Sequence, residues 1–260
     1  RRLKSENAYL RAQLQDRFKL DSIVGRTPVM MRVFELIHTV SATSSTVLIT
    51  GETGTGKELA ARAIHDASPR RSQRFVALNC SAIPETLLEA ELFGHVRGAF
   101  TGAVANRQGR LEQANRGTLF LDEVGTMSPS LQAKLLRVLQ SREFERVGDS
   151  QTIKVDVRVV AATNSDLKKM VAEGSFREDL FYRLNVIPVR IPPLRERRAD
   201  IPILSQFFLD KFAKEAGATR GRMTIAQDAQ QALMAYEWPG NVRQLENVIE
   251  RAFALSPGRS

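Results

Sequence analysis

The chain has 260 residues, 43% hydrophobic and 26% charged, so it is long enough to bury about three quarters of its unfolded surface as a globular protein. No segment approaches the ~18 uninterrupted apolar residues of a membrane span, and no apolar run resembles a signal peptide, so we expect neither an integral membrane protein nor a secreted one. The single cysteine, Cys80, cannot form an internal disulfide, and with three histidines it cannot build a structural zinc site, so we expect a reducing, cytoplasmic environment.

The charge is basic, with 38 Lys and Arg against 29 Asp and Glu and a net charge of +9. Such a balance suits a polyanionic partner. The basic residues are scattered, apart from Arg1-Arg2, Arg70-Arg71 and the run from Arg195 to Arg198. Only 7% of the residues are aromatic, so no stacking platform for nucleic acid is visible. Two interpretations of the charge therefore remain: a surface that binds a polyanion, and an ordinary solvated basic surface.

The first nineteen residues carry a short heptad pattern, with an Asn at one core position that favours a two-stranded coiled coil. An amphipathic linker helix fits two heptads equally well. We therefore expect residues 1–19 to form a helical linker, and we expect the chain, which starts at Arg, to be part of a longer protein. The seam consists of Leu3, Asn7, Leu10, Leu14 and Arg17 or Phe18.

Residues 20–193 alternate apolar runs with helical patterns, which is typical of an α/β fold whose parallel sheet is covered by helices. The carboxyl ends of parallel strands are where ligands bind in open α/β sheets. Five runs predict buried strands: Val47 to Ile49, Phe75 to Leu78, Thr118 to Leu121, Val157 to Ala162, and Val186 to Val189.

After Pro192-Pro193 only helical patterns remain, which predicts a smaller all-helical domain over residues 194–260. Its first helix carries four apolar residues at helical spacing. These are Leu204, Phe207, Phe208 and Phe212.

A glycine-rich loop follows the first predicted strand and opens a helix, which is the context of a phosphate-binding P-loop. Backbone N–H groups, the positive end of the helix dipole and the Lys57 charge would hold the phosphates of a nucleotide. Glu58 stands where Ser or Thr usually ligates magnesium. Val24 and Gly25 are further candidates for nucleotide contact. The loop residues are Gly51, Glu52, Thr53, Gly54, Thr55, Gly56, Lys57 and Glu58.

The third predicted strand delivers an acidic pair, Asp122 and Glu123. With the P-loop upstream, the pair predicts ATP hydrolysis, with Asp122 holding Mg²⁺ directly or through water. Glu123 would orient and deprotonate the attacking water.

Two predicted strands end at asparagines, the second at Asn79 and the fourth at Asn164. Asn164 could sense the γ-phosphate, although Asn164 or Ser165 could instead cap the next helix. Asn79 could hydrogen-bond Glu123, or could simply form a turn at the strand end.

The most specific segment is Gly98-Ala99-Phe100-Thr101-Gly102-Ala103, preceded by Glu91-Leu92-Phe93-Gly94-His95. Together with the P-loop, Glu58 included, it closely resembles the AAA+ domain of the NtrC-like bacterial enhancer-binding proteins. The resemblance extends from about Phe18 to Leu255. The family loop GAFTGA is matched letter for letter.

The resemblance implies a P-loop AAA+ fold with a five-stranded sheet and a helical lid. It also implies that Phe100 and Thr101 touch sigma-54 from a flexible tip, while a buried turn with Phe100 in the core is the alternative. Arg177 and Arg183 correspond to arginine-finger candidates that act on a neighbouring subunit. Ion pairs with Glu178 or Asp179 are the alternative for these arginines.

The family also assigns Arg243 as the sensor II residue. Arg243 is expected in the first turn of a helix, where the macrodipole disfavours a cation. A bound phosphate would compensate, although a purely structural role is the alternative.

The implied function is an ATPase that remodels the closed sigma-54 RNA polymerase holoenzyme at a promoter. The implied assembly is a homo-oligomer, from a dimer to a hexameric or heptameric ring. DNA would be bound through a C-terminal helix-turn-helix that this chain lacks. Two rival functions stay open: an AAA+ helicase or unfoldase, and a nucleotide switch that does not hydrolyse ATP.

Overall fold

The computed structural model describes residues 23–216 and 223–255, so the predicted linker over residues 1–19 lies outside it. The described residues form two compact units. The lid unit contains residues 23–36, 51–59, 191–216 and 223–255, and the sheet unit contains residues 37–50 and 60–190. By its contacts, the P-loop therefore belongs with the helices that follow residue 191. The predicted boundary between residues 193 and 194 stays a prediction.

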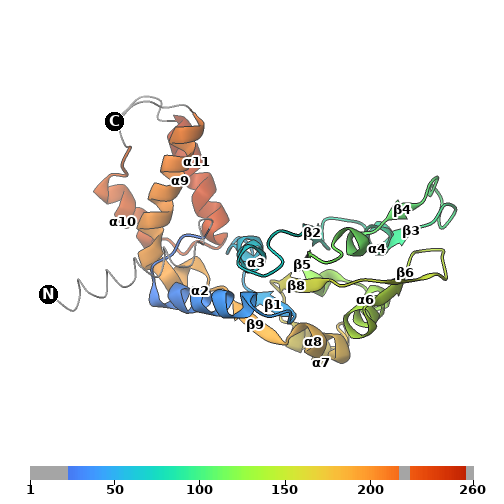
Figure 1. The fold of residues 1–260 in the computed structure, drawn as a ribbon. Coiled ribbons are helices and arrows are strands. Elements are labelled where there is room, and N and C mark those ends of the chain that lie inside the picture. Colours follow the sequence, from blue (N-terminus) through green and yellow to red (C-terminus); the bar gives the residue numbers. More distant parts are fainter. Residues whose placement is uncertain (1–22, 217–222, 256–260) are drawn as a thin grey trace. The chain divides into compact units, whose positions relative to one another are not determined.

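The sheet unit is built on five parallel strands in the order β2-β5-β8-β1-β9 (Figure 1). All five predicted strands are confirmed to within a residue or two. Their bounds are β1 Val47–Thr50, β2 Phe75–Asn79, β5 Thr118–Asp122, β8 Arg158–Thr163 and β9 Ile187–Arg190.

The register aligns the carboxyl ends of these strands. Asn79 lies opposite Asp122, and Thr50, the residue before the P-loop, lies opposite Thr163. Asn79, Asp122 and Asn164 therefore leave the sheet at one edge.

Alternate strand residues point to opposite faces of the sheet. Leu119 and Leu121 enter a core shared with the helices of the unit, whereas Phe120 points away and stacks on Phe75, with ring centroids 6.1 Å apart. The helices of the sheet unit are α4 Glu85–Phe93, α5 Arg110–Gln113, α6 Pro129–Ser141, α7 Leu167–Ala172 and α8 Glu178–Leu184, with a short 3₁₀ turn, η1, at Val124–Thr126.

Two short hairpins project from the sheet unit, and neither appeared in the sequence reading. The first pairs β3 (Gly94–His95) with β4 (Arg107–Gln108), and the second pairs β6 (Glu143–Glu145) with β7 (Thr152–Lys154). Their strands are only two or three residues long, too short for an alternating pattern to be seen.

The lid unit is helical, as predicted after Pro193. Its apolar core includes Leu204, Phe208 and Phe212, whereas Phe207 is 40% exposed. None of the described helices is both long and apolar enough to span a bilayer. The lid elements are η2 Leu194–Asp200, α9 Ile201–Glu215, α10 Gln227–Ala235 and α11 Asn241–Leu255; α2 (Pro28–Ser41) and α3 (Lys57–Asp66) begin in this unit and end in the sheet unit.

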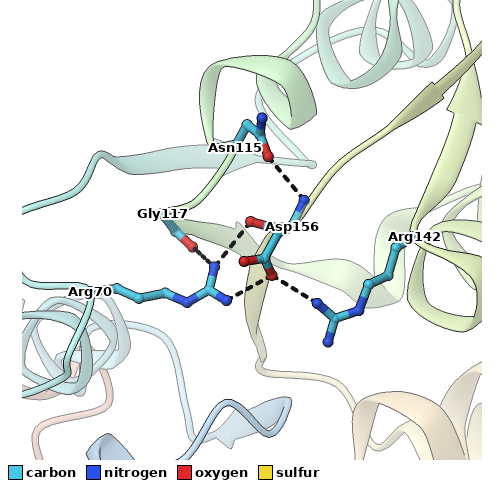
Figure 2. Close-up of polar contacts among 5 residues, drawn as sticks. All are labelled: Arg70, Asn115, Gly117, Arg142 and Asp156. Carbon is cyan, nitrogen blue, oxygen red and sulfur yellow. Dashed lines mark hydrogen bonds and ion pairs between the residues drawn. The ribbon is translucent and has the colours of Figure 1, made fainter.

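Asp156 ties together the loops at the amino-terminal ends of β5 and β8 (Figure 2). Its carboxylate accepts hydrogen bonds of 2.7 Å from both Arg70 and Arg142. Arg70 also donates to the Gly117 and Asp156 carbonyls, and the Asn115 side chain accepts the Asp156 N–H. The hydrogen bond from Arg70, together with the charges of Arg70 and Arg142, outweighs partial burial and holds the pKa of Asp156 below its ordinary value.

This clamp predicts a loss of stability in acid. A carboxyl whose pKa is lowered by folding stabilises the protein above its unfolded pKa, about 3.9, and loses that effect as the pH falls through the folded pKa. The Asp156 side chain is 51% exposed, so we expect less than ~1 kcal/mol. In urea unfolding from neutral pH to below pH ~4, the free-energy difference between the parent and Asp156→Asn should shrink. A difference independent of pH would contradict the assignment.

Candidate nucleotide site and partner loop

The P-loop is preformed in the lid unit. Gly54 and Gly56 adopt φ values of 79° and 101°, the left-handed region that glycine enters without a steric penalty. Lys57 is buried, and its ammonium donates to the Gly51 carbonyl at 2.9 Å. The Thr55 hydroxyl donates to the Glu52 carbonyl at 2.8 Å. The loop therefore has its phosphate-binding shape in this structure, with the lysine held over its own backbone.

The first turn of α11 packs directly on the P-loop within the lid unit. The Asn241 side-chain amide donates to the Glu52 carboxylate and to the Thr53 carbonyl, both at 3.1 Å, and the Arg243 N–H donates to the Gly54 carbonyl at 3.2 Å. A Cβ on Gly54 would lie 2.4 Å from the Gly240 carbonyl oxygen, so only glycine permits this approach. The structure thus brings the exposed Arg243 to the P-loop.

Two arginines of η2 also hold the P-loop. Arg195 donates to both carboxylate oxygens of Glu52, at 2.5 and 2.8 Å, and the buried Arg197 donates to the Thr55 carbonyl at 3.1 Å. Burial lowers the pKa of Arg197. The sequence showed these residues only as a basic run after Pro192-Pro193, and nothing in that run pointed to the P-loop.

Asp200 anchors the segment that contains Val24 and Gly25. This fully buried carboxylate accepts hydrogen bonds from the Arg26 N–H, the Thr27 N–H and the Thr27 hydroxyl, at 2.6, 2.9 and 2.7 Å. Val24 packs against the lid core. The arrangement fixes the position of the segment, and its contact with a nucleotide stays a prediction.

In the sheet unit, the acidic pair leaves β5 in two directions. One oxygen of Asp122 accepts the Glu123 N–H at 3.0 Å, and the other accepts the Asn79 amide at 3.3 Å. Glu123 adopts φ 55° and ψ 48°, a left-handed conformation that is uncommon outside glycine and often marks functional sites. Burial, followed by the charges of Asp122 and Glu123, raises the pKa of the neighbouring Cys80 thiol to about 12.

Each of the two asparagines contacts the acidic pair, and the γ-phosphate contact of Asn164 stays a prediction. Asn79 donates to Asp122 rather than to Glu123, and its oxygen accepts from Ser81 and from the Ala82 N–H, so it also forms the strand-end turn. Asn164 offers Glu123 its backbone N–H, at 3.1 Å.

The alternative role of Asn164 or Ser165, capping the helix after β8, is wrong. Asp166 caps α7 by accepting the Lys169 N–H at 3.1 Å, so neither Asn164 nor Ser165 is the cap. Asp166 is the residue directly before the helix, where its side chain reaches that N–H group.

The two arginine-finger candidates lie at opposite ends of α8. Arg177 is the residue before the helix and forms a two-point ion pair with Asp179, whose hydrogen bond raises the pKa of Arg177. Arg183 is exposed in the last turn, and its guanidinium donates twice to the Leu139 carbonyl at the end of α6, at 3.0 and 3.2 Å. Arg177 thus lies before the first residue of α8 and Arg183 in its last turn, and the two guanidinium groups contact different partners.

The partner loop is a tight tip between β3 and β4. The Gly98 N–H donates to the Ala103 carbonyl at 2.8 Å, and Gly98 and Gly102 have φ values of 83° and 99° with open space where a Cβ would lie. Thr101 is exposed. Phe100 is half-buried, with its ring against His95 at a centroid distance of 5.0 Å. The predicted exposure of Phe100 is therefore only partial in this structure.

The second hairpin supports the foot of this loop. The Val96 N–H donates to the Val147 carbonyl at 3.1 Å, and the Val147 N–H donates to the Gly94 carbonyl at 2.9 Å. Arg146 makes two hydrogen bonds, of 2.9 and 2.7 Å, to Glu112 on α5. The two hairpins are thus joined by backbone hydrogen bonds at the base of the loop. The sequence did not predict this pairing, because it joins residues about 50 positions apart.

Two family models cover almost the whole chain. The first, described as the sigma-54 interaction domain, matches residues 23–190, and the second, an AAA+ ATPase lid domain, matches residues 195–260. The chain belongs to the sigma-54 interaction domain family. The resemblance inferred from the P-loop and the GAFTGA segment is confirmed, and so is the AAA+ fold with a helical lid.

Members of this family are similar to the chain over nearly all of its length. It is 57% identical over 252 residues to the Nif-specific regulatory protein of Azotobacter vinelandii, which covers 96% of the chain and 48% of that relative. It is 55% identical over 258 residues to the formate hydrogenlyase transcriptional activator FhlA of Escherichia coli, covering 99% of the chain and 37% of FhlA. The chain thus spans half or less of the length of these relatives.

Solved structures of a further protein share the fold. NtrX from Brucella abortus, in complex with ADP or with ATP, superposes with a TM-score of 0.86 at 42% sequence identity. The similarity covers 99% of this chain and 56% of the NtrX chain.

Proposed function

We propose that this domain hydrolyses ATP and uses the energy to remodel the closed complex of the sigma-54 RNA polymerase holoenzyme. The observation that carries the proposal is the exposed GAFTGA tip in a chain that also has a preformed P-loop and an acidic pair at a strand end. An AAA+ helicase or unfoldase would lack the GAFTGA tip. A switch without hydrolysis would be favoured by a missing Glu123 or arginine finger, and Glu123, Arg177 and Arg183 are all present.

Within this proposal, the P-loop and the dipole of α3 bind the phosphates, and Lys57 exchanges its Gly51 contact for the β- and γ-phosphates. Arg243 is the sensor II residue, since its helix is fixed to the Gly54 carbonyl. Glu123 takes a proton from the attacking water, and Asn164, at the adjoining strand end, senses the γ-phosphate.

Magnesium fits this residue set. The described residues contain no cluster of three or more metal-ligating side chains, and Mg²⁺ commonly binds through one or two carboxylates together with waters and substrate phosphates. Asp122 would hold the ion, directly or through water. The ion would neutralise charge on the transferred phosphoryl group.

A homo-oligomeric ring completes the proposed mechanism. Arg183, or Arg177, stabilises the developing charge at a neighbouring subunit's nucleotide. DNA is bound by a helix-turn-helix outside this chain. The relatives named as transcriptional activators support this assignment.

The proposal is tested at Thr101, which is exposed at the tip. We expect Thr101→Ala to keep most of the ATPase activity, because the side chain belongs to the partner loop rather than to the P-loop or the acidic pair. It should lose stable binding of sigma-54, because that contact needs the side chains at the tip. The measurement is a pull-down of sigma-54 with the protein trapped by ADP and aluminium fluoride, alongside ATPase rates.

Ser130 offers a matched control, because it is an exposed hydroxyl in the first turn of α6, outside the loop; Ser130→Ala should bind as the parent does. If the parent hydrolyses ATP but fails to bind sigma-54 when trapped, the activator proposal is wrong. If Thr101→Ala binds as well as the parent, only the loop assignment is wrong.

A further inference from the structure

Arginines gather where β2, β5 and β8 begin, at the end of the sheet opposite Asp122. β5 is five residues long, so its first and last residues lie about 13 Å apart along the strand. The Arg74 carbonyl accepts the Thr118 N–H at 2.9 Å, and the Arg116 N–H donates to the Asp156 carbonyl at 2.7 Å. We name this surface the basic edge; its arginines are Arg70, Arg71, Arg74, Arg116 and Arg142.

The backbone brings two of these arginines together. A Cβ on Gly117 would lie only 2.1 Å from the Arg74 carbonyl oxygen, so the missing side chain lets the Arg74 strand end approach Arg116. Arg116 adopts φ 65° and Arg142 adopts φ 59°, in the left-handed region that favours glycine and asparagine. An arginine in this backbone conformation has a conformational cost. Its presence at these two positions therefore calls for a role of the side chain.

The Arg142 side chain has a partner within the protein, because its guanidinium pairs with the Asp156 carboxylate (Figure 2). The exposed guanidinium groups of Arg71, Arg74 and Arg116 make no hydrogen bond or ion pair with any residue in the described ranges 23–216 and 223–255. Their charges are directed to solvent.

Two acidic groups near the basic edge are already paired. Asp156 is shared between Arg70 and Arg142, and Glu143 pairs with Lys154, so neither carboxylate neutralises Arg71, Arg74 or Arg116. The buried Arg158 lies behind the edge and donates to the Val40 and Ser41 carbonyls. Burial, followed by the charge of Arg70, lowers the pKa of Arg158 to about 10, so Arg158 keeps its charge at neutral pH.

We propose that the basic edge binds the phosphate backbone of duplex DNA without reading its sequence. Guanidinium groups match phosphate oxygens in a two-point geometry. The cations extend across three neighbouring strand ends, or about 10 Å, a length over which duplex DNA presents several phosphates. Phe75, the aromatic ring at this edge, is covered by the Arg62 guanidinium at 4.7 Å, so the edge offers no platform for stacking single-stranded bases.

This contact is distinct from the promoter recognition proposed for a helix-turn-helix outside the chain. It would hold DNA next to the domain through charge alone. Its strength should therefore fall steeply with salt.

The test measures fluorescence anisotropy of a labelled duplex of arbitrary sequence at about 50 to 200 mM salt. The variant combines Arg71→Gln, Arg74→Gln and Arg116→Asn, because asparagine tolerates the left-handed backbone of Arg116. We expect at least ~10-fold weaker binding near 0.1 M salt. The slope of log affinity against log salt should become shallower by about 0.9 for each arginine that contacts a phosphate. ATPase activity should not change.

A matched control removes three exposed cations from other elements, Lys168→Gln, Lys214→Gln and Arg251→Gln. The control should bind duplex almost as the parent does. Equal losses in both variants would show that only net charge matters and would overturn the proposal. The proposal would also be wrong if the parent bound no duplex at low salt. It would be wrong as well if polyglutamate competed as strongly as duplex at equal charge, because the partner would then be an acidic protein surface. If the triple variant unfolds early, Arg71→Gln alone should still weaken binding.

Discussion

Glu123→Gln is expected to bind ATP about as well as the parent and to hydrolyse it at least ~100-fold more slowly, because a general base contributes a factor of about 10² to 10⁴. Glutamine keeps an oxygen that can accept the Asn164 N–H, as Glu123 does at 3.1 Å. The exchange therefore removes basicity while preserving the local contact. ATPase rates and the affinity for a fluorescent ATP analogue measure the two effects separately.

Lys57→Ala should show the opposite pattern, a loss of ATP binding. A hydrogen bond to a charged group contributes about 1.5 to 3 kcal/mol, so the dissociation constant should rise about 10- to 100-fold. Glu250→Gln, at an exposed position of α11, should leave both quantities unchanged. If Glu123→Gln hydrolysed ATP at the parent rate, Glu123 would not be the base.

Arg183→Ala should assemble and bind ATP yet hydrolyse it ~10³-fold more slowly or worse, because an arginine supplied by a neighbouring subunit acts mainly on charge that develops in the transition state. In this structure Arg183 donates to the Leu139 carbonyl on α6. Arg183→Ala also removes this structural hydrogen bond, so the thermal stability of the variant must be measured together with its ATPase rate. Arg137→Ala, which removes an exposed arginine paired with Glu145 on the same unit, is the matched control and should hydrolyse ATP normally.

Mixing two inactive variants tests whether Arg183 acts between subunits. Rings that combine Arg183→Ala with Lys57→Ala contain interfaces where one subunit supplies the P-loop and the other the arginine. These interfaces should regain turnover. The absence of any recovery in rings shown to be mixed would count against a shared site.

The sequence predicted the five strands of the sheet because each is a buried, nearly continuous apolar run bounded by turns. It also located the P-loop, the acidic pair and the GAFTGA segment, because each of these motifs is contiguous and its chemistry depends on residues adjacent in the chain. The roles assigned to individual site residues stay predictions, which the variants above test.

Individual side-chain contacts at the strand ends could not be predicted in this way. Asp122 rather than Glu123 receives the Asn79 amide because the strand register sets Asn79 opposite Asp122. Asp166 rather than Asn164 or Ser165 caps α7, because Asp166 directly precedes the helix and its side chain accepts the Lys169 N–H.

Length and local motifs by themselves indicated an α/β P-loop AAA+ domain of the sigma-54 interaction family, because the P-loop and the GAFTGA segment are each short and contiguous in the chain. Only the tertiary structure decided that Arg195, Arg197 and Asn241 hold the P-loop, that a second hairpin supports the GAFTGA tip, and that separate arginines form one basic edge. Those contacts join residues far apart in the chain. They exist only once the chain has folded, and no local pattern records which distant segments meet.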